Sequence, residues 1–371
     1  MRRGSDATPW RGSAVRLAAL AIGAAVVLSF PAMAGNPYML TVGIGILNYA
    51  VLATAWNFVG GFTGYISLGH GALSGLGAYG TGLLIVHAGL PSFAALAVAA
   101  AIVAMLAIPI GVAALRVRGA SFVIVSIALV LILLLVFQSW ASLTGGSRGF
   151  VVPRPFPDLH RAEHHRVFFF LFSALLALVL VAWWLIDRSH FGLGLKAIRE
   201  DEDKAQSLGI PTFAAKLVVF IVSAAFTALG GGLYALWFGD LDPVFQFSVM
   251  SGATTVLMAL LGGVRHLFGP LLGALVVGAG LEYGKLAYGD TPLHLVITGV
   301  LLGSVVMFLP EGIIPGLAPG LAPGLGLFKR RGASPPEASI REVTAAALLD
   351  ANRRDPEERA AERADAAEVS R

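Results

Sequence analysis

The sequence predicts an all-α, polytopic membrane protein with about ten transmembrane helices. Of its 371 residues, 57% are hydrophobic and only 13% are charged, which is about half the charged share of a soluble domain. The apolar residues form continuous runs, and residues 123–137 contain no charge at all. A helix needs about 20 apolar residues to cross a bilayer, whereas a transmembrane β-barrel would alternate at every second residue. These observations exclude a soluble domain and a single-anchor protein.

Ten apolar segments are expected to span the membrane. The first follows four arginines and ends at Ala32-Met33-Ala34, so residues 1–34 are either a retained helix or a cleaved signal peptide. Glycine and polar residues interrupt the third, eighth and ninth segments. The ten segments cover residues 15–34, 39–59, 66–87, 93–114, 121–140, 167–186, 213–238, 247–263, 268–287 and 293–309.

The positive residues of the loops predict that both termini face the cytoplasm. This orientation places residues 116–118, 188–204 and 329–331 inside, as the positive-inside rule requires. Loop 141–166, with four arginines outside, is the exception, but the reversed orientation would misplace more positive charge. The net charge of +4 therefore reflects topology, and we expect no nucleic acid as a partner.

Two regions with different composition are expected. Residues 1–315 should form the transmembrane domain. Residues 316–371 should form a cytosolic tail that is mostly disordered, because prolines interrupt it and it is rich in charges of both signs.

The cytosolic loop of residues 187–212 is expected to hold one amphipathic helix from about residue 193 to 208. Arg199 and Asp203 lie four residues apart and would support the helix as an ion pair, and Gly209 suits the position just after its end. Such a helix could present an apolar stripe to a partner's groove, or the segment could be a solvated loop. The residues expected to share the apolar side are Leu195, Ile198, Ala205 and Leu208.

Two glycine-rich stretches, residues 60–80 and 262–284, contain repeated GxxxG spacings. Small residues at this spacing allow two membrane helices to approach closely. The alternative is a broken or re-entrant helix that lines a substrate path, because irregular backbone at membrane depth needs a cavity or protein cover.

Residues that could carry chemistry are scarce. The chain has no cysteine, which excludes thiolate metal sites and cysteine nucleophiles, and no stretch reads GxxxxGK[ST]. No nucleophile, base and metal set can be recognised, so we expect no enzymatic activity, no cofactor and no metal. His160, Glu163, His164 and His165 are expected to be solvated rather than metal ligands.

Polar residues inside the expected spans have two possible roles. They can line a translocation path, or they can make hydrogen bonds between helices. Glu282, near one end of the ninth span, would be the first candidate in an ion-coupled carrier. The candidates for the path are Asn48, Asn57, Ser67 and His70.

Several stretches resemble one known family, the permease subunits of bacterial ABC importers for branched-chain amino acids, of the Liv-type M subunit. The matching stretches begin with GYISLGHG at Gly64, LRVRGASF at Leu115, LTGGSRGF at Leu143 and GLGLKAIRE at Gly192. The last continues to residue 235, and LLGGVRHLFGP at Leu260 and FLPEGIIPGL at Phe308 follow. The resemblance covers roughly residues 38–317, and Arg265-His266 is a mild departure from it.

The resemblance implies a permease subunit of an ATP-driven importer in the bacterial cytoplasmic (inner) membrane. It would form the translocation path for branched-chain or other small amino acids by alternating access. The implied partners are a second, related permease, two P-loop ATPase subunits, an extracytoplasmic substrate-binding protein and the lipid bilayer. The alternatives are a urea or short-chain amide importer and an ion-coupled secondary transporter.

The resemblance also singles out two loops. It leaves the role of an outward-facing motif open, and the residues of that motif are Thr144, Gly145, Gly146 and Gly149. It makes the loop of residues 192–209 the contact that couples this subunit to the ATPase, with candidate residues Gly192, Lys196, Ala197, Arg199, Glu200, Glu202 and Gly209.

Overall fold

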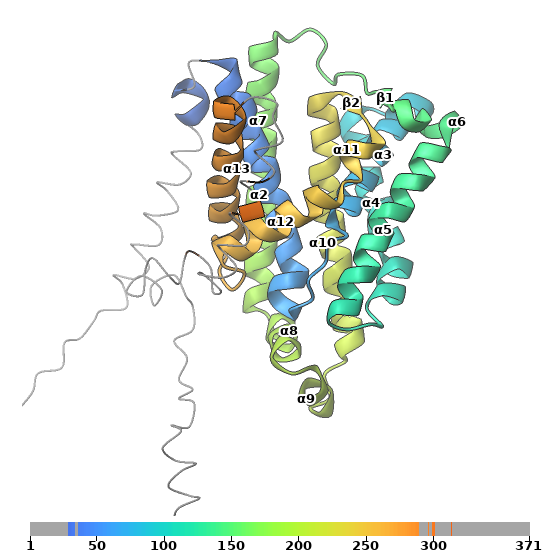
Figure 1. The fold of residues 1–371 in the computed structure, drawn as a ribbon, viewed down its shortest axis with the longest axis vertical. Coiled ribbons are helices and arrows are strands. Elements are labelled where there is room, and N and C mark those ends of the chain that lie inside the picture. Colours follow the sequence, from blue (N-terminus) through green and yellow to red (C-terminus); the bar gives the residue numbers. More distant parts are fainter. Residues whose placement is uncertain (1–28, 34–35, 289–295, 297–298, 301–312, 314–371) are drawn as a thin grey trace, which may run out of the picture. The chain divides into compact units, whose positions relative to one another are not determined.

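The computed structural model describes residues 29–33, 36–288, 296, 299–300 and 313 (Figure 1). This part of the chain is α-helical apart from short turns and one two-stranded ribbon of β1 (Phe150–Val151) and β2 (Asp240–Leu241), with a 3-10 turn η1 (Gly146–Arg148). The helices are α2 (Pro37–Thr63), α3 (His70–Ala88), α4 (Ser92–Ala114), α5 (Ala120–Ser139), α6 (Ala141–Thr144), α7 (Arg161–Arg188), α8 (His190–Glu200), α9 (Glu202–Ser207), α10 (Thr212–Phe238), α11 (Pro243–Gln246), α12 (Val249–Gly262) and α13 (Gly269–Tyr288).

The expected spans between residues 39 and 287 all correspond to helices, with bounds that differ by a few residues. The spans at 15–34 and 293–309 and the tail at 316–371 lie outside the described residues except at a few positions. Among the described helices, six are long and apolar enough to cross a membrane. The chain is therefore a polytopic α-helical membrane protein, and ten spans with both ends inside stay a prediction.

Helix α2 begins and ends at clear sequence signals. The side chain of Asn36 accepts a hydrogen bond from the Tyr38 N–H at 3.0 Å, and Pro37 occupies the first helical position, where its missing N–H costs nothing. At the other end Gly64 has φ +76° and donates its N–H to the Gly60 carbonyl. This left-handed conformation favours glycine and stops the helix.

Helix α2 forms the centre of the bundle and contacts α7, α10, α12 and α13 (Figure 1). Phe58 stacks on Phe226 of α10 with ring centres 5.7 Å apart, and Phe62 stacks on Trp183 of α7 at 5.0 Å. Lipid gives little hydrophobic drive for helix association, so close packing of this kind holds membrane helices together.

The glycine-rich stretches lie where backbones cross. A Cβ on Gly77 of α3 would overlap the backbone of Ala228 on α10, and a Cβ on Gly252 of α12 would overlap the carbonyl of Leu68. The close packing expected from the sequence is thus confirmed. Residues 64–69 are non-helical between α2 and α3, near the loop expected between the second and third spans, and a broken or re-entrant helix that lines a substrate path stays a prediction.

Helix α5 is the least buried of the six helices that are long and apolar enough to cross a membrane. The buried residues of α5 are Phe122, Ser126 and Val130, which lie four residues apart on one side. On its other sides Ile124 and Leu135 are 67% and 62% exposed. An exposed apolar surface of this kind suits contact with acyl chains or with another membrane subunit.

The motif from Thr144 to Gly149 follows α5 and holds its end in place through hydrogen bonds and close backbone contacts. The Thr144 hydroxyl donates to the Trp140 carbonyl at 2.8 Å and accepts the Gly146 N–H at 3.3 Å. Gly145, Gly146 and Gly149 all have positive φ, and a Cβ on Gly149 would overlap the Leu241 carbonyl of β2. The motif therefore has a structural role, in which glycine is needed both for conformation and for close approach.

The histidines at the start of α7 are not solvated as the sequence suggested. His164 is 6% exposed and packs on Phe168, and His165 accepts a hydrogen bond from the Trp237 indole N–H at 3.0 Å. The expectation was wrong for these two residues, because helix α7 begins earlier than expected and turns their rings toward the bundle, whereas His160 and Glu163 are exposed as expected. Within the described residues no group of His, Cys, Asp and Glu could hold a metal ion.

We predict that Gly273→Ala on α13 destabilises the protein and that Gly280→Ala does not. A Cβ at Gly273 would overlap the Met258 carbonyl of α12, whereas one at Gly280 meets no atom within 4 Å. Overpacking of this kind costs about 1–3 kcal/mol, while alanine gains about 0.5–1 kcal/mol over glycine inside a helix. Thermal unfolding in detergent measures both variants, and equal melting temperatures for the two would contradict the packing.

Candidate functional site

The segment of residues 190–207 forms two helices, α8 and α9, rather than the single helix expected from the sequence. They are separated by Asp201, whose backbone is extended at φ −162° and ψ 110°. Its carboxylate accepts the N–H groups of Asp203 and Lys204 at 3.1 and 3.0 Å. Aspartate is among the preferred N-cap residues, so this local capping outweighs the helical pattern across the break.

The expected apolar face is only partly confirmed. Leu195, Ile198 and Ala205 are at most 3% exposed, but Leu208 is 80% exposed because it lies beyond the end of α9. Gly209 has φ +83°, as expected after a helix. The ion pair expected between Arg199 and Asp203 is absent, since the Asp201 break separates the two residues and each bonds to another segment.

Arg199 of α8 caps the end of α2. Its guanidinium donates a hydrogen bond to the Gly61 carbonyl, one of the last carbonyls of α2, which have no partner inside the helix. The positive charge also suits the negative end of the helix dipole. Burial lowers the pKa of Arg199, and nearby Arg265 lowers it further. Arg199 thus ties α8 to the point where α2 gives way to residues 64–69.

Glu202, the first residue of α9, is the centre of a polar cluster that is buried at Lys216 and exposed at Arg118. Its carboxylate accepts the Lys216 ammonium at 2.6 Å and the Tyr65 hydroxyl at 2.8 Å, and the Arg118 guanidinium lies 3.4 Å away. The ammonium of Lys216 also donates to the Tyr65 hydroxyl at 2.8 Å. Arg118 in addition bonds to Asp203 at 2.9 Å. We call Tyr65, Arg118, Glu202 and Lys216 the Glu202 cluster.

The Glu202 cluster joins segments that are far apart in the sequence. Tyr65 follows α2, Arg118 lies in the turn between α4 and α5, and Lys216 lies in the first turns of α10. The side chains of Lys216 and Glu202 are 3% and 12% exposed. Figure 1 shows α8 and α9 below the lower ends of α2 and α10. The position of α9 is therefore fixed against three membrane helix ends at once.

The charges of the Glu202 cluster are stabilised by each other. Burial acts to raise the pKa of Glu202, but hydrogen bonds from Lys216 and Tyr65 and the nearby Arg118 bring it below its ordinary value. Burial, followed by the contact with Glu202, raises the pKa of the Tyr65 hydroxyl. At neutral pH Glu202 is consequently ionised and Tyr65 keeps the proton that it donates.

Of the other expected coupling residues, some pack against the bundle and Glu200 is exposed. Gly192 and Lys196 hold α8 to the end of α7: a Cβ on Gly192 would overlap the Ile186 carbonyl, and Lys196 pairs with Asp187 at 2.6 Å. Ala197 is partly buried against the core. Glu200 is exposed, as are Leu193 and Leu208. These last three residues form the outward surface of the loop.

The expected path residues Asn48, Asn57, Ser67 and His70 are all buried, on α2, in residues 64–69 and at the start of α3. His70 Nε2 lies 2.7 Å from the Ser223 hydroxyl, and that hydroxyl donates to the Ala55 carbonyl at 2.6 Å. Because serine has a single proton, His70 must donate through Nε2. The side-chain atoms of Asn57 have no hydrogen-bond partner among the described residues. These groups lie inside the bundle, and their role in a path stays a prediction.

Sequence reasoning missed Tyr65, Arg118, Lys216 and Ser223. One signal was available for Lys216, because a single lysine at the start of an apolar span must be paired or reach water. The partner could not be read from the sequence, since Glu202 and Lys216 lie on separate elements whose packing decides the contact.

Comparison with known proteins shows which family the chain matches. Residues 38–306 match the family model described as branched-chain amino acid transport system, permease component. The chain is 28% identical to the high-affinity branched-chain amino acid transport system permease protein LivM of Escherichia coli K12, over 75% of this chain and 72% of the relative. It is 28% identical to LivH of the same strain, over 72% of this chain and 91% of the relative.

A shorter similarity links the chain to the guanosine ABC transporter permease protein NupQ of Bacillus subtilis. The two are 33% identical over 28% of this chain and 32% of the relative. No solved structure matches the chain.

We predict that Lys216→Met destabilises the protein far more than Lys204→Met. Removing Lys216 leaves Glu202 buried without its closest counter-ion, and breaking a buried pair costs roughly 3–5 kcal/mol. Lys204 is 84% exposed and, within the part of the chain that the structure describes, pairs with Asp201 alone, and such surface pairs contribute about 0–1 kcal/mol. Thermal unfolding of the two variants in detergent at pH 7 tests this, and an equally small effect of both would show that the Glu202 cluster does not hold the fold.

Proposed function

Because the chain belongs to the family of permease components of branched-chain amino acid transport systems, we propose that it is the membrane-spanning subunit of an ATP-driven importer that couples to its ATPase through α8 and α9. One observation carries this proposal: the two helices dock on membrane helix ends through Arg199 and the Glu202 cluster. A loop held in this way can pass a displacement to the bundle, whereas a solvated loop cannot.

In the proposed mechanism, separate ATPase subunits bind the outward surface of the loop formed by Leu193, Glu200 and Leu208. ATP binding displaces α8 and α9. Arg199 and Tyr65 transmit that displacement to residues 60–69, and from there it reaches the His70–Ser223 contact between α3 and α10. Helix shifts of about 1–2 Å are enough to switch packed membrane helices between two arrangements. Access would then alternate between the two sides of the membrane.

The proposed assembly contains a second, related permease, two P-loop ATPase subunits and an extracytoplasmic substrate-binding protein. The similarity of this chain to both LivM and LivH supports a paired permease. ATP hydrolysis belongs to the separate ATPase subunits, in keeping with the lack of a GxxxxGK[ST] sequence in this chain.

We propose branched-chain or other small amino acids as the cargo. The names of LivM and LivH support this assignment, and the similarity to the guanosine permease covers a much shorter stretch. A urea or short-chain amide importer and an ion-coupled secondary transporter are accordingly not favoured.

The proposed location is the bacterial inner membrane, with α8 and α9 in the cytoplasm. The exposed basic residues Arg116 and Lys204 lie at the same end of the bundle as these helices. This distribution supports the orientation, because positive residues of short loops stay on the cytoplasmic side.

We predict that Arg199→Ala combined with Glu202→Ala lowers substrate-stimulated ATP hydrolysis of the reconstituted importer about tenfold, within the range of typical coupling free energies. The two changes release α8 from α2 and α9 from α10, so loop movement no longer reaches the bundle. The measurement is ATPase activity with and without the loaded binding protein.

The matched control is Arg161→Ala combined with Glu163→Ala, which removes an exposed arginine and glutamate at the opposite end of the bundle. Basal ATP hydrolysis and subunit co-purification should stay normal in the control, and both double variants are assayed at equal amounts of assembled complex because loss of Glu202 also leaves Lys216 without its counter-ion. If the Arg199 and Glu202 double variant keeps full stimulation, the coupling role of the loop is wrong.

A further inference from the structure

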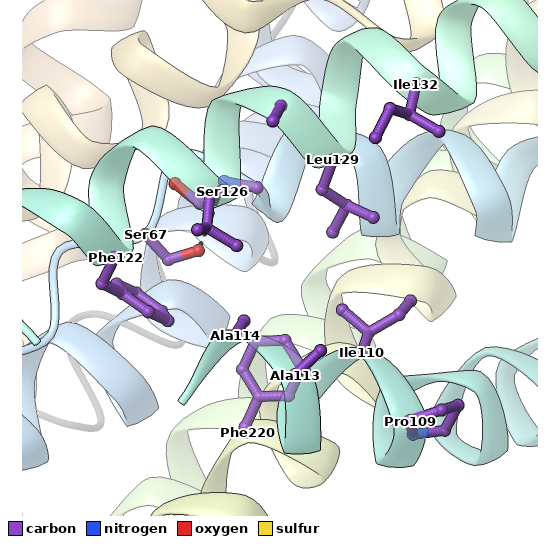
Figure 2. Close-up of a pocket in the computed structure, with 13 residues that line it drawn as sticks. Ser67, Pro109, Ile110, Ala113, Ala114, Phe122, Ser126, Leu129, Ile132 and Phe220 are labelled. Carbon is purple, nitrogen blue, oxygen red and sulfur yellow. Dashed lines mark hydrogen bonds between the residues drawn. The ribbon is translucent and has the colours of Figure 1, made fainter. Parts of the chain in front are cut away.

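A pocket of about 440 Å³ lies between α4 and α5 and is lined almost entirely by hydrocarbon. Figure 2 shows Leu129 and Ile132 of α5 on one side, Ile110 and Ala113 of α4 on the other, and Phe220 of α10 at the floor. An apolar cavity of about 150 Å³ already stays dry and takes up small hydrocarbons. A pocket of this size and lining therefore favours an apolar occupant over water.

The polar side chains at the pocket offer little to a polar ligand. The Ser126 hydroxyl donates to the Val123 carbonyl at 2.7 Å and accepts the Leu68 N–H at 3.0 Å. The Ser67 hydroxyl accepts the Gly69 N–H at 3.2 Å. A zwitterionic amino acid would lose its hydration here without replacement hydrogen bonds, so the transported cargo does not suit this pocket.

The pocket opens on the exposed apolar surface of α5. Val125 and Ile132 of α5 line it and are 37% and 57% exposed, and the neighbouring Ile124 is 67% exposed. The described end of the first helix lies elsewhere, because Phe30 stacks on Phe169 of α7 at 5.3 Å. An acyl chain of the surrounding bilayer can therefore reach the pocket directly.

A basic residue follows the pocket lining closely in the chain. Ala113 and Ala114 line it, and Arg116 follows two residues later in the turn between α4 and α5. Arg116 is exposed and makes no ion pair among the described residues, unlike Arg118, which is engaged with Glu202 and Asp203. Basic residues beside gaps between membrane helices on the cytoplasmic side bind anionic lipid head groups.

We propose that an anionic phospholipid binds at this site, with one acyl chain in the pocket between α4 and α5 and its phosphate at Arg116. The assignment to the cytoplasmic leaflet rests on the orientation given under the proposed function. Arg116 and Arg118 share one short turn, so the bound lipid steadies the turn that donates to Glu202 and Asp203. Anionic lipid thereby supports the coupling loop.

The test uses the full permease complex purified from its native membrane and exchanged into vesicles that contain phosphatidylglycerol with a photoreactive group in one acyl chain. After illumination, mass spectrometry maps the labelled peptides. The label is expected on residues 109–114 and 122–132. Phosphatidylcholine with the same photoreactive chain is the comparison for the head group and should label these peptides about fivefold less.

Two variants and two matched controls separate the parts of the site. Arg116→Gln removes the charge and Ala113→Phe fills the pocket, and both should lower labelling about fivefold, while Arg116→Lys keeps it. Arg154→Gln changes an exposed arginine at the opposite end, and Ala97→Phe changes an exposed alanine of α4 outside the pocket. Both controls should label normally.

The proposal is overturned if phosphatidylglycerol and phosphatidylcholine label the pocket equally, or if α7 is labelled as strongly as α4 and α5. It is also overturned if the pocket peptides stay unlabelled while peptides of another subunit carry the lipid label. Labelling requires neither ATP nor substrate, so its failure leaves the proposed transport function intact. A failure of ATPase coupling would in turn leave the lipid site intact.

Discussion

The buried carboxylate of Glu202 is the constraint on which the arrangement of the coupling end depends. A buried ionised group is stable only with close counter-charges and hydrogen bonds. Here they come from Lys216, Tyr65 and Arg118 on three different segments. Together with Arg199 at the end of α2, this requirement places α8 and α9 at one position against the membrane helices.

Inside the bundle, close packing of helix backbones fixes the positions of the helices. Lipid does not drive apolar helices together, so contact depends on how near two backbones can come. Gly77 against Ala228 and Gly252 against Leu68 show where that approach occurs. By contrast, α5 is held mainly along one narrow side and at its ends, by the Thr144–Gly149 motif at one end and the turn with Arg118 at the other. The molecule thus combines a tightly packed centre around α2 with a lightly held helix at its edge.

The sequence predicted most of the helices but not the contacts that make the site. Long apolar runs gave α4 and α10 within a residue or so, because a bilayer imposes both length and polarity on a helix. The break at Asp201 was missed because a capping side chain outweighed a helical charge pattern. Leu208 was expected on the buried face of the same helix, and it is exposed because that helix is broken at Asp201 and ends before it. The partners of Glu202 were missed because ion pairs between distant segments depend on how the helices pack. The periodicity of the sequence carries no information about that packing.

The central claim is that the Glu202 cluster makes α9 and the α4–α5 end move as one body. Because the chain has no cysteine, its spin labels attach only at introduced Gln206→Cys on α9 and Ile124→Cys on α5, two exposed positions outside the proposed ATPase contact, and the subunit is labelled before the importer is assembled. Pulsed electron paramagnetic resonance then measures their separation in the assembled importer. The account predicts the same distance with and without ATP, and a broadened distribution when Glu202→Gln is added. A distance that shifts with ATP while Glu202 is intact would contradict it.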